Sequence, residues 1–139
     1  MSKLIATITD IESVDGLNIV TFTCNEVPLK MMSLDLNQNI QIGKRVVLVC
    51  KPTSVALAKP TINHKAFSEM LSYANQIKVK IVSMDAGILL SSIKLQFGDF
   101  SLEAIITSAS AERMKLNEKD ELLALIKANE LSIQEVLND

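Results

Sequence analysis

The sequence predicts an all-β fold made of two similar small barrels of five strands each, and three observations support this prediction. The second half of the chain repeats the apolar pattern of the first half. Within each half, apolar and polar residues alternate as they do in half-buried strands. Each half also has two alternating runs joined by a two-residue turn, which is a strong signal for a β-hairpin. Five short strands within about 60 residues are typical of a closed or nearly closed barrel of the oligonucleotide-fold (OB) type.

The internal repeat becomes visible when the second half is placed on the first. An offset of 73 residues places Ile8 on Ile81, and later in the chain an offset of 76 residues places Lys51 on Lys127. Apolar positions fall on apolar ones throughout, and turn residues fall on turn residues. The change of offset means that the first copy is three residues shorter, within the segment 31–42.

Both copies are expected to contain the same elements in the same order. A first strand leads into an acidic turn, a hairpin, a short polar segment, a fourth strand and a short fifth strand. The strands of the first copy are expected near residues 4–11, 18–24, 27–32, 45–51 and 54–57. Those of the second copy are expected near residues 77–84, 91–97, 100–106, 121–127 and 130–133.

The chain is therefore expected to divide into a first repeat (1–59), a connector (60–71) and a second repeat (72–139). Pro60 and Asn63 interrupt the strand pattern, and the following "HKAFSEML" is expected to form two helical turns. Since small barrels bury little apolar surface alone, we expect the repeats to pack against each other or against other subunits.

Composition and charge exclude several classes of protein. The 139 residues are 48% hydrophobic and 22% charged, as in globular domains. No apolar run is long enough to cross a membrane, and the N-terminus lacks the apolar core of a signal peptide, so a cytoplasmic location is expected. A net charge of −2, scattered basic residues and only one Tyr, four Phe and no Trp argue against nucleic-acid binding.

The sequence indicates neither a catalytic centre nor a metal site. Cys24 and Cys50 fall in predicted strands, where reduced buried thiols are expected. His64 is the only histidine, and with two distant cysteines it provides no zinc site. A Ser-His-Asp or Cys-His centre would depend on the same histidine, and no nucleophile elbow marks one. We therefore expect a binding protein without catalytic residues or direct metal ligands, and not an enzyme.

Three short motifs mark the second copy: "SYANQ" at 72–76, "TSAS" at 107–110 and "LIKA" at 125–128. With these motifs the second copy resembles the molybdopterin-binding-protein (Mop) unit, also called the TOBE domain. The first copy shows the resemblance more weakly, so the whole chain is similar to a tandem di-Mop protein. The chain shows neither a Walker motif nor a helix-turn-helix region and so resembles the stand-alone members.

The resemblance implies OB-like barrels that bind molybdate or tungstate in the cytoplasm, for storage or homeostasis. It also implies a homo-oligomer, a dimer or trimer, that holds the oxyanion at subunit contacts. The sequence does not distinguish molybdate from tungstate, whose sizes and charges are close.

The resemblance further implies an oxyanion site in the second copy. The residues that match the family pattern are Ser72, Asn75, Thr107, Ser110, Lys127 and Ala128, the last through its backbone amide. A tetrahedral dianion needs several convergent donors, and hydroxyls, amides at a helix start and a lysine provide them. The family's arginine position is occupied by Ala74, which removes a bidentate donor.

The first copy is expected to serve as a scaffold. Lys51 corresponds to Lys127, but the next residue is Pro52, which has no N–H to donate. The segment that would carry the hydroxyl pair is the one shortened by three residues.

An alternative reading remains for the second copy as well. Hydroxyl residues before a helical turn are often N-caps, and a lysine at a strand end is often simply solvated. The alternative function is a structural or interaction module, a decayed TOBE domain that partners a molybdate transporter or regulator.

Overall fold

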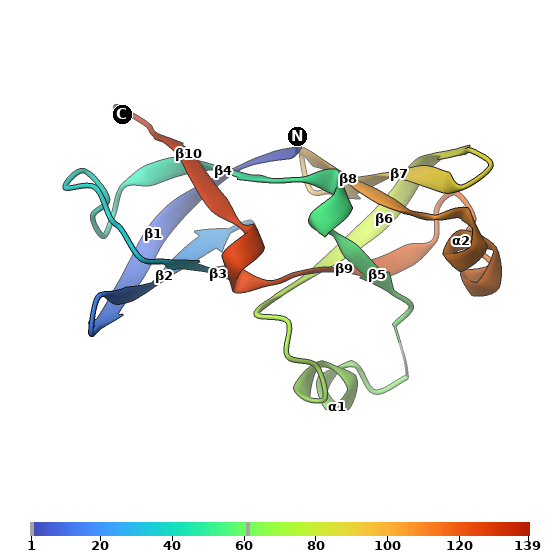
Figure 1. The fold of residues 1–139 in the computed structure, drawn as a ribbon, viewed down its shortest axis with the longest axis horizontal. Helices are drawn as coiled ribbons and strands as arrows, with labels where there is room; N and C mark the ends of the chain where they lie inside the picture. The colour runs from blue at the N-terminus through green and yellow to red at the C-terminus, as the bar shows by residue number, and fades with distance from the viewer. Residues whose placement is uncertain (1, 61) are drawn as a thin grey trace.

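Two five-stranded antiparallel sheets make up the computed structural model, which describes residues 2–60 and 62–139 (Figure 1). The first repeat contains β1 (Ser2–Val14), β2 (Leu17–Cys24), β3 (Val27–Ser33), β4 (Arg45–Cys50), the 3-10 helix η1 (Pro52–Ser54) and β5 (Ala56–Ala58). The second repeat contains β6 (Asn75–Ala86), β7 (Leu90–Phe97), β8 (Phe100–Thr107), α2 (Ser108–Met114), β9 (Glu121–Ile126), the 3-10 helix η2 (Ala128–Glu130) and β10 (Ser132–Val136). The predicted all-β fold of two five-stranded units is confirmed.

The predicted helix of the connector is present as α1 (His64–Glu69). It begins after Asn63, whose side-chain oxygen accepts a hydrogen bond from the backbone N–H of Ala66 at 3.1 Å. Among the described residues, no helix is long and apolar enough to span a membrane.

The two sheets exchange their last strands. One sheet has the order β10-β4-β1-β2-β3 and the other the order β5-β9-β6-β7-β8. The two exchanged strands pair in equivalent registers, Ile133 with Leu48 and Leu57 with Ala124. Both fifth strands thus lie near their expected residues, but each completes the sheet of the other repeat. The sequence boundary at 59/60 does not separate the two sheets.

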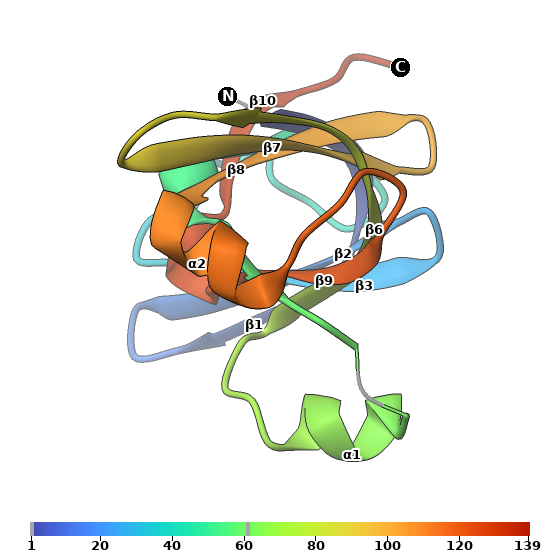
Figure 2. The same cartoon turned by 90° about the vertical axis from the view of Figure 1, so that its right-hand side faces the viewer.

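The first strand of each repeat is long and carries a bulge at the same position. The pairing register shifts between Ile8 and Asp10 in β1, and between Ile81 and Ser83 in β6. A bulge bends its strand and increases the local twist, which allows the sheet to curl. Figure 2 looks onto the second repeat and shows β6 curving from β9 to β7, with α2 beside the rolled sheet.

The buried apolar side chains of both repeats form one continuous core. Val55 and Leu131, which follow η1 and η2, are buried to 2% and 3% exposure and belong to this core. Full burial of such a side chain stabilises a fold by about 1.5–3 kcal/mol. The strand exchange is therefore anchored at both crossing points.

The two predicted hairpin turns meet where the repeats face each other. Asn25 and Glu26 adopt positive φ values of 49° and 65°, as a type I′ turn requires. The side-chain amide of Asn25 donates a hydrogen bond to the carbonyl of Phe97 at 3.3 Å. Gly98 adopts a φ of 60°, and a Cβ there would lie 2.4 Å from Asn25 Nδ2. Glycine at position 98 takes this positive φ without strain and leaves room for the Asn25 side chain, which would have to move for a larger residue.

Candidate anion-binding site

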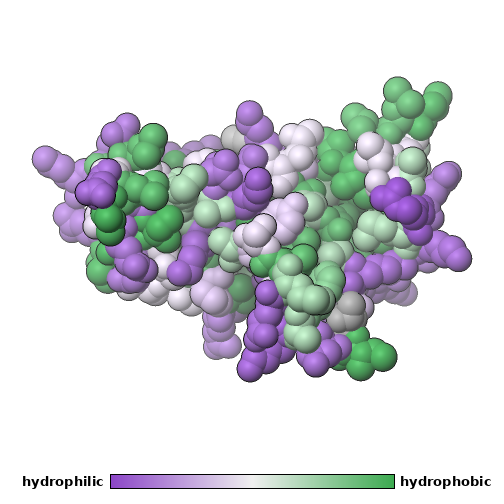
Figure 3. Space-filling model, turned by 60° about the horizontal axis from the view of Figure 1, so that its bottom comes forward, coloured by the Kyte–Doolittle hydropathy of each residue, from purple (hydrophilic) through white to green (hydrophobic). Residues whose placement is uncertain are grey.

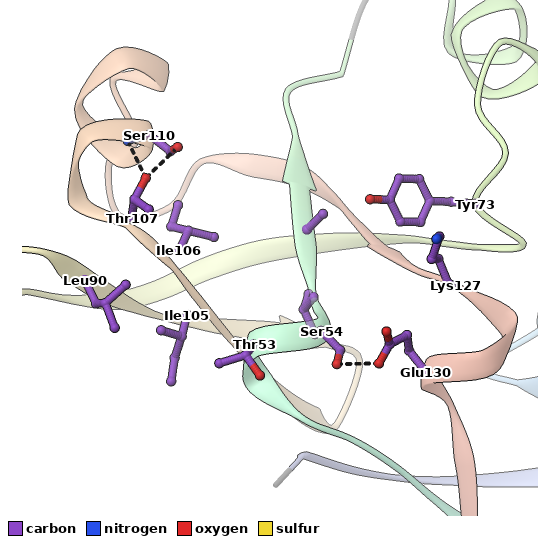
Figure 4. Close-up of a pocket in the computed structure, with 12 residues that line it drawn as sticks. Thr53, Ser54, Tyr73, Leu90, Ile105, Ile106, Thr107, Ser110, Lys127 and Glu130 are labelled. Carbon is purple, nitrogen blue, oxygen red and sulfur yellow. Dashed lines mark hydrogen bonds between the residues drawn. The ribbon is translucent and has the colours of Figure 1, made fainter.

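A pocket of about 550 Å³ lies where the exchanged segment of the first repeat meets the second repeat (Figure 4). Its polar lining consists of Thr53, Ser54, Tyr73, Thr107, Ser110, Lys127 and Glu130. The structure thus brings together three of the six residues expected to bind the anion: Thr107, Ser110 and Lys127. The exchanged segment also supplies two hydroxyl side chains from the first repeat.

Thr107 and Ser110 form one hydrogen-bonded unit at the start of α2. Thr107 is the N-cap, and its Oγ1 accepts a hydrogen bond from the backbone N–H of Ser110 at 3.1 Å. The same hydroxyl donates its proton to Ser110 Oγ at 2.8 Å. Thr107 is therefore an N-cap, as the alternative interpretation of the sequence allowed. Its hydroxyl proton is engaged by Ser110 Oγ.

Arg113 is a residue that the sequence analysis overlooked. Its guanidinium donates a hydrogen bond to Ser110 Oγ at 3.1 Å. Ser110 Oγ thus accepts two bonds, and its own hydroxyl proton is left to donate into the pocket. Residues three apart on a helix lie on the same face, so the spacing of Ser110 and Arg113 could have identified this contact from the sequence.

Lys127 precedes η2 and is exposed, with extended backbone at φ −68° and ψ 152°. Ala128 begins η2, and the first N–H groups of such a helix have no partner within it. In Figure 4, Tyr73, Lys127 and Glu130 lie along one wall of the pocket. This wall offers an ammonium group and a phenol, but also a carboxylate, while Ala128 is not among the lining residues.

Glu130 is the second overlooked residue of the site. Its Oε2 accepts a hydrogen bond from Ser54 Oγ at 2.7 Å. Ser54 and Glu130 occupy equivalent positions in the two repeats, since the offset of 76 residues relates them. The bond therefore links the two 3-10 helices.

Asn75 lies outside the pocket and is 0% exposed. Its Nδ2 donates to the carbonyl of Lys30 at 2.9 Å, and its Oδ1 accepts from the N–H of Lys30 at 2.7 Å. Ser2, the equivalent residue of the first repeat, accepts a bond from the N–H of Glu103 at 2.8 Å. Asn75 therefore joins β6 to β3, and its contact with an anion stays a prediction.

Ser72 is exposed, while its neighbour Tyr73 is half-buried and lines the pocket. The opening motif therefore contributes a tyrosine hydroxyl to the lining, which the sequence analysis did not consider. Ala74, at the position of the family's arginine, is exposed.

The first repeat presents the lysine but not the hydroxyl pair. Lys51 precedes η1 with φ −74° and ψ 141°, the same conformation as Lys127, and Pro52 follows it. It lines a smaller pocket of about 260 Å³ together with Asn129 and Glu130. After Ser33, where α2 would begin in the second repeat, residues 34–44 form no helix.

Both cysteines are free and buried. Burial raises the pKa of Cys24 to about 11, and burial likewise raises the pKa of Cys50 to about 11, against a small opposing effect of the N-terminal charge. Neither thiol faces the pocket. Within residues 2–60 and 62–139, no group of three or more His, Cys, Asp or Glu side chains is placed to hold a metal ion.

Residues 71–133 match the family model of the TOBE domain. Over its whole length the chain resembles the crystal structure of the cytoplasmic molybdate-binding protein ModG, a form grown from PEG with molybdate bound. The TM-score is 0.83 at 17% sequence identity, and the match covers 94% of this chain and 93% of that chain. At this identity the likeness establishes the fold. No curated protein matches the sequence.

Proposed function

Residues 71–133 match the TOBE domain, and on that premise we propose that the chain binds a tetrahedral oxyanion, molybdate or tungstate, without a chemical reaction. The fold shared with ModG, which was crystallised with molybdate, supports this ligand class. A role in cytoplasmic storage or homeostasis of the oxyanion accords with a binding protein of this kind.

The observation that carries the proposal is the pocket, which collects donors from distant parts of the chain. Ser110 has a hydroxyl proton to donate, and Lys127 contributes an ammonium group. Ala128, the residue after Lys127, begins η2 but is not among the residues that line the pocket. Tyr73 adds a phenol, and Thr107 orients Ser110. Several convergent donors of these types are what a tetrahedral dianion requires.

We propose that a homo-oligomer, a dimer or trimer, completes this site. The pocket of about 550 Å³ is much larger than one tetrahedral oxyanion, so a single chain does not enclose the ligand. Beside it, the tip of the β6–β7 hairpin exposes Ile88, Leu89 and Leu90 to 97%, 80% and 56% (Figure 3). Contiguous apolar side chains at a surface are typical of subunit contacts. Ser72, exposed one residue before Tyr73, is then available to an anion held between subunits.

A thermal-shift titration with molybdate, tungstate, sulfate and phosphate tests the proposal. At a hundredfold excess over the dissociation constant, binding stabilises the folded state by about 2.7 kcal/mol, so the melting temperature should rise clearly. We expect this rise with molybdate and tungstate and a much smaller one with sulfate. Absence of any rise with all four anions would contradict the proposal.

Two observations favour the alternative of a decayed TOBE domain that acts as an interaction module. The Thr107 hydroxyl is engaged in capping α2, and Ala74 stands where the family has its arginine. Such a module would partner a molybdate transporter or regulator and would show no oxyanion-dependent stabilisation. The same titration therefore separates the two functions.

A further inference from the structure

Glu130 is the only carboxylate among the described residues that line the 550 Å³ pocket. It also lines the smaller pocket that contains Lys51. The same acidic side chain therefore lines the pocket of Lys127 and the pocket of Lys51, so an anion bound in the larger pocket shares it with a carboxylate.

A backbone turn brings Lys127 and Glu130 to the same pocket. The N–H of Glu130 donates to the carbonyl of Lys127 at 3.0 Å, which closes a tight turn. Figure 4 shows the side chains of Lys127 and Glu130 on the same wall.

Ser54 fixes the carboxylate from the other repeat. Its hydroxyl donates to Glu130 Oε2 at 2.7 Å. This bond satisfies one carboxylate oxygen, and the remaining acceptor capacity of the group is open to a donor from a ligand.

Oxyanions differ in whether they can provide such a donor. Molybdate, tungstate and sulfate carry no proton at neutral pH, so they only accept hydrogen bonds. A carboxylate also only accepts, and two negative groups at close range repel each other. Hydrogenphosphate carries an O–H that can donate to a carboxylate, which forms a short charge-assisted bond.

Building on the proposed oxyanion site, we infer that Glu130 is a specificity-determining residue: it weakens the binding of proton-free oxyanions at Lys127 and favours oxyanions that carry an O–H. With Glu130 present, the pocket is then less selective for molybdate over phosphate than the same pocket would be without this carboxylate.

The test uses the full chain with Glu130→Gln, which removes the charge and retains an acceptor for the Ser54 hydroxyl. Glu12→Gln is the matched control, because Glu12 is exposed at the far end of β1 and lines neither pocket. Dissociation constants for molybdate, sulfate and phosphate are measured by isothermal titration at mildly alkaline pH, where phosphate is present as hydrogenphosphate. Equal melting temperatures of the three proteins without ligand verify that the fold is unchanged.

We expect Glu130→Gln to tighten molybdate and sulfate binding by about tenfold, since it removes a nearby like charge. Phosphate binding should stay the same or weaken, and Glu12→Gln should change none of the three constants. Detectable molybdate binding by Glu130→Gln alone would also support the inference.

Two results would overturn the inference while leaving the proposed function intact. One is equal tightening of all three anions, which would show a general charge effect. The other is molybdate binding by the unmodified chain that Glu130→Gln does not improve. A different result, no binding of any oxyanion by either protein, would overturn the proposed site and this inference together.

Discussion

At the scale of single residues, hydrogen bonds decide which polar side chains of the TOBE motifs are free to meet a ligand. Thr107 and Ser110 belong to the same motif, yet one caps α2 while the other keeps a hydroxyl proton to donate. Asn75 belongs to the opening motif, is buried, and makes one hydrogen bond from each side-chain polar atom to the backbone of Lys30. Lys127 extends into the pocket from the start of η2. The motif therefore contains ligands, caps and structural residues side by side.

The hydroxyl pair should respond to mutation in two different ways. Thr107→Ala removes an N-cap, so it should lower the free energy of unfolding by about 1 kcal/mol. Ser110→Ala removes a donor to the anion, so it should weaken oxyanion binding by about 0.5–1.5 kcal/mol with a smaller effect on stability. Chemical denaturation and isothermal titration of both variants measure the two effects. If both variants lose stability and neither loses affinity, Ser110 belongs to the cap alone.

The two lysines at equivalent positions provide a matched pair. Lys127→Ala should weaken oxyanion binding by about 1.5–3 kcal/mol, the usual contribution of a hydrogen bond to a charged group. Lys51→Ala should change it little, because Pro52 offers no N–H and α2 has no counterpart in the first repeat. Isothermal titration with molybdate compares the two. Equal losses would mean that both repeats share the anion and that the first repeat is not a scaffold.

At the scale of strands and helices, the hairpins, the connector helix and the repeat offset could be predicted because they depend on local patterns. Apolar alternation and two-residue turns are properties of short segments, and the bulges at equivalent places in β1 and β6 confirm the offset. The strand exchange could not be predicted, since β5 and β10 would present the same short apolar pattern to either sheet. The contributions of Ser54 and Glu130 to the pocket depend on that exchange, so they could not be predicted either.

Asn75 connects β6 to β3, so replacing its side chain should lower the free energy of unfolding. Asn75→Ala leaves the N–H and C=O of Lys30 without their partner at the contact between β6 and β3. Loss of hydrogen bonds at a buried site costs about 1–3 kcal/mol of folding free energy. Urea denaturation should show this loss, and Asn39→Ala, exposed in the loop after β3, serves as control. A variant as stable as the control that binds molybdate less tightly would show that Asn75 is a ligand.

At the scale of the whole molecule, the chain is an internally exchanged pair of repeats around one core. β5 crosses to the second sheet and β10 crosses to the first, in equivalent registers. Val55 and Leu131 anchor the two crossings in the common core. Hydrogen bonds of Ser2 and Asn75 connect the first strand of each repeat to the third strand of the other repeat. The pocket lies on one of these crossings, so its geometry depends on both repeats being present.

This architecture predicts the behaviour of the second repeat by itself. A fragment of residues 71–139 lacks β5, so β9 would have an unpaired edge, while its own β10 would have no β4 to pair with. Because Ile133 and Leu57 occupy equivalent positions on their partner strands, β10 of one fragment can take the place of β5 in another. Two fragments that exchange β10 reciprocally form a closed symmetric dimer in which β9 is paired on both sides. Light scattering should therefore give a dimer, and hydrogen exchange should show protection of β10. A folded monomeric fragment would show that the sheet is stable without the exchanged strand, and that the pairing of the two repeats is not required for the fold.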